Sequence, residues 1–199
     1  MKIRKEFKVE SAHIVRNASS YRCSHSIHGH SATIEVFLTG NKLDNAGMIY
    51  DFGLMKSTIK EFIDSMDHCY ILWEKDDEDF KDFVKNNCDR WIELPFNPSA
   101  ECLSLFIHFW VNYILNHTRK NNGEGDVKCC GVRYHETATG FAESCDEDFE
   151  SLWDVSWSFF SNYKFSDGVK NDWSDNLRDI LLHYDIVDNP TISQQVKVD

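Results

Sequence analysis

Two stretches near the N-terminus alternate between apolar and polar residues, and this pattern limits the possible fold more than any other feature. In residues 5–14, KEFKVESAHI, every second side chain up to His13 lies on one face of an extended chain. Residues 28–39, HGHSATIEVFLT, alternate again, and His28 and His30 share a face with the apolar residues that follow them. The stretch between the two is polar and typical of a loop. We therefore expect two long antiparallel strands.

Further patterns along the chain predict the fold class. Residues 52–66 and a segment that begins near Ser99 carry apolar residues at helical spacing. Residues 126–136 are expected to form a strand, and a turn then leads into a last strand that reaches residue 144. Residues 70–98, which include an acidic run and two prolines, are expected to form an irregular loop. This order predicts an α+β fold, with a four-stranded antiparallel sheet and two helices on one face.

The length and the change in composition along the chain suggest one main domain. A chain of 199 residues is near the usual size of a single domain. After residue 145 the sequence becomes acidic and rich in tryptophan, and it carries no motif with a recognisable chemistry. We predict a domain of residues 1–145 and an acidic, mainly helical C-terminal extension, residues 146–199, packed on the core.

The charge balance and the cysteines limit the environment and the partners of the protein. The chain has 33 acidic and 21 basic residues and a net charge of −12. This balance argues against tight, non-specific binding to nucleic acid or to an anionic membrane. The seven cysteines are odd in number and scattered. Because the N-terminus has no apolar leader and no stretch approaches the roughly 18 apolar residues of a membrane span, we expect a cytoplasmic protein with reduced thiols.

The histidines at the strand ends are the main candidates for a functional site. His28 and His30 are two positions apart on one strand, so their side chains project side by side. Antiparallel pairing of the two strands could bring His13 next to them. Three neutral imidazoles that converge suit Zn²⁺, and three protein ligands leave a fourth position for water or substrate. The alternative is that they are ordinary polar residues at a strand end.

Cys23 lies in the polar stretch before the second strand, and the residues alone leave its role open. As a fourth zinc ligand it would close the site and make the metal structural. As a free thiol beside an open site it would be a nucleophile or a base. Spacing does not decide between the two.

Six short motifs follow one another in an order that points to one family. Any one of them is weak, whereas six in order at near-family spacing are specific. Through them the chain resembles the 6-pyruvoyl-tetrahydropterin synthase family, most of all its bacterial branch that forms 6-carboxy-tetrahydropterin, from about residue 3 to residue 143. The motifs are SAH at 11–13, Cys23 followed by HGH at 28–30, GMIYDFGLMK at 47–56, MDH at 66–68, NPSAE at 97–101 and HETATG at 135–140.

This resemblance implies a fold, an assembly and a set of site residues. The fold would be the tunnelling fold (T-fold), in which the sheets of several subunits join into an oligomeric barrel. The usual assembly is a homohexamer made of two trimers, with active sites between subunits. The family's site residues correspond here to the zinc ligands His13, His28 and His30, the catalytic residues Cys23, Asp67 and His68, and the substrate-binding Glu136.

Some of these residues also have a non-catalytic explanation, and Cys23 has an alternative for its role as base. Without the family, Asp67 and His68 are an exposed pair at a helix end, and Glu136 is a surface glutamate at a strand end. Four residues separate Cys23 from the HGH motif, whereas the best-known members have three or five. Ser24 occupies the three-residue position, so both Cys23 and Ser24 are candidates for the base.

The implied activity is that of a zinc-dependent carbon–carbon lyase of queuosine biosynthesis. It would convert a small-molecule partner, 7,8-dihydroneopterin triphosphate, to 6-carboxy-5,6,7,8-tetrahydropterin with release of acetaldehyde and triphosphate. One alternative enzyme eliminates only the triphosphate and leaves the 6-pyruvoyl product. An alternative of another class is a non-catalytic, zinc-stabilised assembly module with Cys23 as fourth ligand. The candidates for holding the triphosphate are Arg16, Arg22, Lys56 and Arg133.

Overall fold

The computed structural model describes residues 1–151 and 162–188, and its central feature is the expected pair of long strands. β1 (Lys2–His13) and β2 (His28–Thr39) pair antiparallel along their whole length. Their alternating pattern places one face of each strand in the core, because successive side chains point to opposite sides of a sheet. The predicted strands and their pairing are confirmed.

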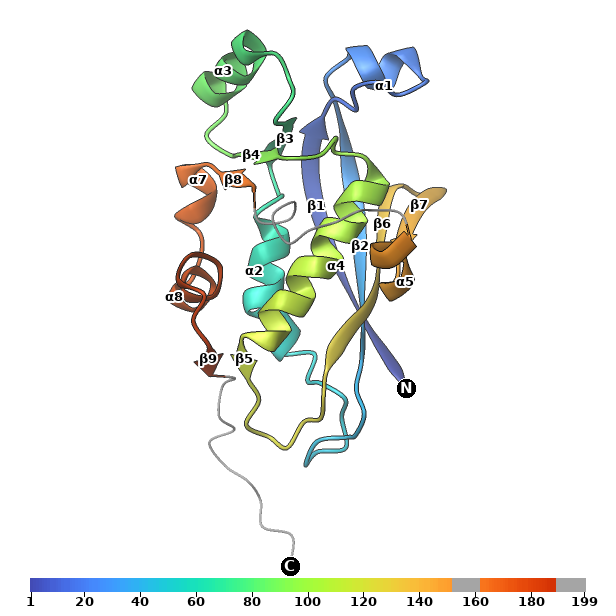
Figure 1. Cartoon of the computed structure of the whole chain (residues 1–199), viewed down its shortest axis with the longest axis vertical. Coiled ribbons are helices and arrows are strands. Elements are labelled where there is room, and N and C mark those ends of the chain that lie inside the picture. Colours follow the sequence, from blue (N-terminus) through green and yellow to red (C-terminus); the bar gives the residue numbers. More distant parts are fainter. Residues whose placement is uncertain (152–161, 189–199) are drawn as a thin grey trace, which may run out of the picture.

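The remaining elements lie on both sides of this pair and are labelled in Figure 1. The other strands are β3 (Cys69–Trp73), β4 (Trp91–Leu94), β5 (Thr118–Arg119), β6 (Lys128–Thr137), β7 (Gly140–Ser144), β8 (Lys164–Phe165) and β9 (Val187–Asp188). The helices are α1 (Tyr21–His25), α2 (Thr58–Asp64), α3 (Glu78–Asn87), α4 (Ala100–Asn116), α5 (Asp146–Ser151), α7 (Asp167–Lys170) and α8 (Asp175–Arg178), with a 3₁₀ turn η1 (Leu54–Lys56) and a π-helical turn η2 (Asp179–His183).

The main sheet has seven strands in the order β7-β6-β2-β1-β3-β4-β8, so the prediction of a four-stranded sheet was wrong in number. The four expected strands are present as the antiparallel set β7-β6-β2-β1. β3 and β4 add to it in parallel, and β8 closes that side. Residues 70–98, which were expected to be a loop, therefore contain two strands and a helix. β3 has the sequence CYILW with four of its five residues buried, and such a strand shows no alternation.

The helices also differ from the sequence expectation in their limits. Residues 52–66 form the turn η1 and the separate helix α2, because Ser57 between them has φ −93° and ψ −122°, which is not helical. The expected helix start near Ser99 is confirmed, and the structure adds that the Ser99 hydroxyl caps α4 by accepting the Cys102 N–H at 3.4 Å. In Figure 1, α2 and α4 lie side by side over one face of the sheet, as predicted for the α+β class.

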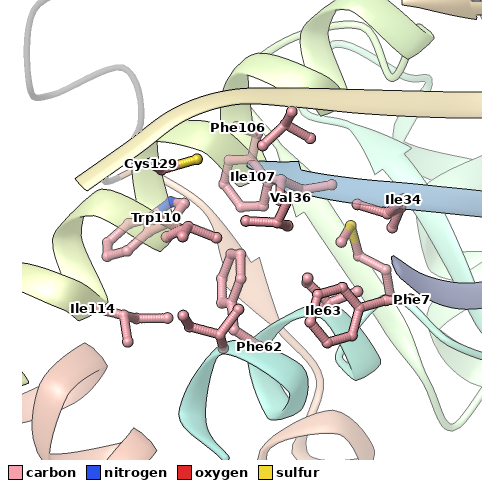
Figure 2. Close-up of a cluster of buried hydrophobic side chains, with 14 of the residues drawn as sticks. Phe7, Ile34, Val36, Phe62, Ile63, Phe106, Ile107, Trp110, Ile114 and Cys129 are labelled. Atoms are coloured by element: carbon pink, nitrogen blue, oxygen red, sulfur yellow. The ribbon is translucent and has the colours of Figure 1, made fainter. Parts of the chain in front are cut away.

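The core fills the space between these two helices and the sheet. Figure 2 shows Phe62 of α2 and Phe106 and Trp110 of α4 directed toward Ile34 and Val36 of β2. Ile34 and Val36 are 0% exposed. Burial of one large apolar side chain contributes about 1.5–3 kcal/mol, so this packing fixes β2, and with it the histidines at its start.

The extension predicted for residues 146–199 falls partly outside the described residues, which omit 152–161 and 189–199. Its described part contains α5, β8, α7, α8, η2 and β9. β8 joins the main sheet, and Trp173, Leu177 and Ile180 are buried in the same core cluster as α2 and α4. The division of the chain at residue 145 stays a prediction. No helix in the described ranges is long and apolar enough to cross a membrane.

Candidate metal centre and active site

The strand register brings the three predicted metal ligands together. His13, the last residue of β1, lies opposite His28, the first of β2, and Ser11 lies opposite His30. The ring centroids of His13 and His28 are 4.7 Å apart, and each of these rings is 5.2 Å from that of His30. One ring nitrogen from each histidine lies within 4.8 Å of the others. This spacing suits three imidazoles around one cation.

The hydrogen bonds around the cluster leave nitrogen atoms free to face a cation. Nε2 of His13 and Nε2 of His30 are buried and have no hydrogen-bond partner among the described residues. The other ring nitrogen of His13 donates to the Pro98 carbonyl, and Nδ1 of His28 donates to the Ser26 carbonyl at 2.9 Å. Metal-binding histidines are commonly oriented in this way, by a second hydrogen bond from the ring. The residues present therefore fit a metal ion.

The electrostatics of the cluster keep His13 neutral. Burial, together with the nearby charges of His28 and His30, lowers the pKa of His13 to about 4. A neutral imidazole has the lone pair that metal binding needs, so His13 is ready to bind a cation at neutral pH.

Glu136 lies beside the cluster. Its Oε1 is 3.8 Å from Nε2 of His13, and burial raises its pKa, while charge on His30 and His28 opposes the rise and Glu101 adds to it. The β6–β7 register shifts between residues 135 and 137, so Glu136 is the extra residue of a β-bulge. Bulges redirect side chains next to sites. The influence of Glu101 also shows that the first turn of α4 approaches the site.

Cys23 and Ser24 occupy different environments on α1. Ser20 caps this helix, and its hydroxyl accepts the Cys23 N–H at 3.4 Å and donates to Cys23 Sγ at 3.3 Å. The hydroxyl of Ser24 is buried and contacts the Ser20 carbonyl at 3.0 Å and Nδ1 of His25 at 2.8 Å. Cys23 is only half-buried. Cys23 is not among the residues whose ligand atoms gather at the histidine cluster.

Asp67 and His68 form a hydrogen-bonded pair in the turn between α2 and β3. Nδ1 of His68 lies 2.9 Å from Oδ2 of Asp67, and the Glu10 N–H donates to Oδ1 of Asp67 at 2.7 Å. Burial alone would raise the pKa of Asp67, but the hydrogen bonds from Glu10 and His68 outweigh burial and hold the pKa below its ordinary value. The carboxylate is therefore charged at neutral pH.

Within a single chain this pair stands apart from the metal ligands. The His68 side chain is 75% exposed, whereas that of His13 is 5% exposed. His30 and His68 both line an open cavity of about 600 Å³, but no hydrogen bond or ion pair in the described part of the chain joins the pair to the three histidines. One chain thus assembles the histidines with Glu136, but not with Asp67 and His68.

The candidate triphosphate ligands also separate into two groups. Arg16 donates to Asp76 at 2.7 Å, and Arg133 donates to Glu143 at 2.6 Å, so acidic neighbours already hold both guanidinium groups. Arg22 is exposed on α1. Lys56 lines a cavity of about 840 Å³, which His68 also lines.

Comparisons with known proteins identify the family of the chain. A protein-family model described as 6-pyruvoyl tetrahydropterin synthase matches residues 2–147. A protein of Helicobacter pylori strain J99 named 6-carboxy-5,6,7,8-tetrahydropterin synthase is 41% identical over 175 residues, which are 88% of each chain. A relative of the same name from Aquifex aeolicus is 30% identical over 125 residues, covering 61% of this chain and 75% of its own.

Solved structures show the same fold. An uncharacterized protein of Wolinella succinogenes, WS1659, superposes with a TM-score of 0.58 at 20% identity, covering 73% of this chain and 98% of its own. The 6-pyruvoyl tetrahydropterin synthase of Plasmodium falciparum superposes with a TM-score of 0.52 at 16% identity, covering 72% and 96%. At these identities the likeness concerns the fold alone.

The family match extends over most of the chain and contains every residue of the candidate site. The expected resemblance, and the expectation that the protein is an enzyme of this kind, are confirmed by the relatives that align over 88% of the chain. The chain belongs to the 6-pyruvoyl tetrahydropterin synthase family.

Proposed function

We propose that this protein is a zinc-dependent lyase that converts 7,8-dihydroneopterin triphosphate to 6-carboxy-5,6,7,8-tetrahydropterin, releasing acetaldehyde and triphosphate, for queuosine biosynthesis. The observation that carries the proposal is the cluster of His13, His28 and His30 beside the carboxylate of Glu136, in which His13 and His30 each have a buried ring nitrogen without a hydrogen-bond partner. The names of relatives at about 40% identity support the 6-carboxy product over the 6-pyruvoyl product.

His13, His28 and His30 would hold the zinc. Bound there, zinc would act as a Lewis acid toward oxygens of the substrate side chain and make the neighbouring C–H groups more acidic. Three protein ligands leave room for substrate, and the absence of Cys23 from the ligand group favours this open site over a closed structural one. This favours an enzyme over the zinc-stabilised assembly module.

Cys23 is the base in this proposal, and it takes a proton from carbon. Its sulfur is half-exposed and accepts a hydrogen bond from the Ser20 hydroxyl at 3.3 Å. Ser24 is a poorer candidate because its hydroxyl is buried and engaged with the helix backbone and His25. Geometry thus favours Cys23 where spacing left the choice open.

Asp67 and His68 would complete the proton path, with the carboxylate orienting the imidazole. Since the pair is exposed and separate from the metal ligands of its own chain, it would serve a site on a neighbouring subunit. Glu136 would bind the pterin, because a carboxylate can accept hydrogen bonds from both an amino group and a ring N–H. The cytoplasmic location stays a prediction from the sequence.

An oligomeric barrel is supported by the free edge of β1. β1 pairs with β3 only at Ser11, Ala12 and His13, so in the described residues its backbone from residue 2 to residue 9 has no strand partner on that side. Such an edge is a template for another strand. We propose that a second copy pairs there, as part of a homohexamer of two trimers.

The product test is direct. Incubation of the zinc-loaded protein with 7,8-dihydroneopterin triphosphate should yield one acetaldehyde for each 6-carboxy-tetrahydropterin, because cleavage of the carbon–carbon bond releases both. Mass spectrometry of the pterin and trapping of the aldehyde as a hydrazone measure the two products. Formation of the 6-pyruvoyl pterin without acetaldehyde would identify the alternative enzyme.

The metal prediction separates ligands from neighbours. His28→Ala and His30→Ala should each reduce bound zinc well below one ion per chain, because each removes one of three ligands. Cys23→Ala should keep the metal, and His25→Ala is the matched histidine control, since His25 stacks on Tyr21 outside the cluster. Zinc is measured by mass spectrometry after gel filtration. Loss of zinc from Cys23→Ala as severe as from His28→Ala would instead support the closed structural site.

The base prediction compares two adjacent residues. Cys23→Ala should lower kcat by roughly a hundredfold or more, the usual scale for a positioned acid or base, with little change in substrate binding. Ser24→Ala should keep most of its activity. Steady-state kinetics and calorimetric titration measure the two effects. An inactive Ser24→Ala beside a normal Cys23→Ala would move the base to Ser24.

The assembly prediction concerns mass in solution. Light scattering on the full chain should give a mass near six times 23.2 kDa, because the site needs groups from neighbouring copies. Replacing one residue whose N–H points to the free edge by proline, as in Lys8→Pro, should weaken assembly by disrupting strand pairing. Lys8 has the same backbone orientation as Glu10, whose N–H and carbonyl face the β3 side of β1. A fully active monomer would contradict both the barrel and the shared site.

A further inference from the structure

Arg90 holds the backbone of the turn that carries Asp67 and His68. Its Nε donates to the Asp67 carbonyl at 2.9 Å, and its Nη2 donates to the Asp64 carbonyl at 2.9 Å. The Asp67 carbonyl belongs to the peptide that links Asp67 to His68. A hydrogen bond to this carbonyl therefore helps to fix the orientation of the peptide from which the imidazole of His68 extends.

The same guanidinium group reaches the C-terminal part of the chain. Nη1 of Arg90 donates to the Gly168 carbonyl at 3.2 Å and pairs with Asp172. Only glycine fits at position 168, because an added Cβ would lie 2.5 Å from the backbone oxygen of Asp89. The segment around α7 thus packs directly on the backbone next to Arg90, and the five donors of a guanidinium suit such branched contacts.

Two further side chains connect this C-terminal segment to the end of α2. Nε1 of Trp173 donates to Oγ of Ser65 at 2.8 Å, and Trp173 is buried. The hydroxyl of Ser174 donates to Glu61 at 2.6 Å. Residues 166–174, which we name the clamp segment, therefore contact the stretch just before the Asp67–His68 pair at several independent points.

The pair needs such support because its backbone is unusual. His68 has φ +51°, in the left-handed region that non-glycine residues seldom adopt. The cost of such a conformation is of order 1–3 kcal/mol, and it persists only where the surroundings hold it. On the other side of the turn, the Glu10 N–H donates to Asp67 and the Glu10 carbonyl accepts the His68 N–H.

We propose that Arg90 and the clamp segment are positioning elements that hold the Asp67–His68 pair in its working geometry. The clamp segment lies beyond residues 2–147, where the family match ends, so it is an addition to the family's core. The proposal rests on the proposed function for the catalytic meaning of the pair. Its structural part, that these contacts fix the turn, stands on the hydrogen bonds alone.

The kinetic test uses the zinc-loaded full chain. Arg90→Ala should lower kcat about tenfold or more with little change in KM or zinc content, because a misplaced proton carrier slows the reaction step and leaves binding intact. Arg90→Lys should also be slow, since one ammonium cannot reach both carbonyls. Added guanidinium ion at millimolar concentration should restore part of the kcat of Arg90→Ala, because the missing group borders the open 840 Å³ cavity.

Two clamp-segment variants supply the matched comparison. Trp173→Phe keeps an aromatic ring beside Phe165 and removes the N–H to Ser65 together with the smaller ring of the indole, so it should lower kcat by a smaller factor, about twofold to tenfold. Asp167→Asn is the control: its exposed carboxylate pairs only with Lys170 in the same short helix and does not reach the turn. Asp167→Asn should match the wild type. Equal loss in Asp167→Asn, or normal kcat in both Arg90→Ala and Trp173→Phe, would overturn the proposal.

Hydrogen exchange tests whether these contacts fix the turn, independently of whether the Asp67–His68 pair takes part in catalysis. Hydrogen exchange at the Glu10 and His68 amides, which bond to Asp67 and to Glu10 in the wild type, should speed up in Arg90→Ala and Trp173→Phe but not in Asp167→Asn. Unchanged exchange would overturn the positioning role even if activity fell. If Asp67→Asn itself turns over normally while exchange responds as expected, the proposed role of the pair fails and the clamp remains.

Discussion

The register of β1 on β2 is the constraint on which the site depends. His13 meets His28 at the end of the ladder, and Ser11 meets His30, so three imidazoles share one face. A shift of one residue would send His28 and His30 to the opposite face, because side chains alternate along a strand. The packing of Ile34 and Val36 against α2 and α4 prevents such a shift, since it would expose both side chains. The hydrophobic core thus sets the metal site as well as the stability of the fold.

The parts of the fold that alternation or capping encodes could be predicted from the sequence. β1 and β2 follow from period-two patterns, and the start of α4 near Ser99 follows from apolar residues at helical spacing. β3 could not be recognised in this way, because a strand covered on both faces has no polar positions to mark its period. The break at Ser57 was also missed, since apolar spacing continues across it and only the backbone conformation interrupts the helix.

The residues of the candidate site also differ in whether a periodic sequence pattern predicts them. The alternation of side chains along two paired strands was enough to group His13, His28 and His30. Glu136 required the family resemblance, because a β-bulge that redirects a side chain leaves no periodic pattern in the sequence. Arg90 could not be found at all. Its acceptors are mainly backbone carbonyls, at Asp64, Asp67 and Gly168, and every residue type offers such a carbonyl. A sequence shows which donors exist, but not which distant carbonyls the fold presents to them.

The contact of Arg90 with Gly168 has a consequence for substitutions at these two positions. Arg90 lies within the residues that the family model matches, and it divides its hydrogen bonds between that part of the chain and a segment beyond it. A chain cut before the segment would leave two guanidinium N–H groups of Arg90 without their present acceptors. A bulkier residue at 168 would collide with the backbone of Asp89, next to Arg90, and a shorter residue at 90 would lose the acceptors in both parts. The effects of substitutions at the two positions are therefore coupled, and truncation of the C-terminal part would also disturb the turn that Arg90 holds.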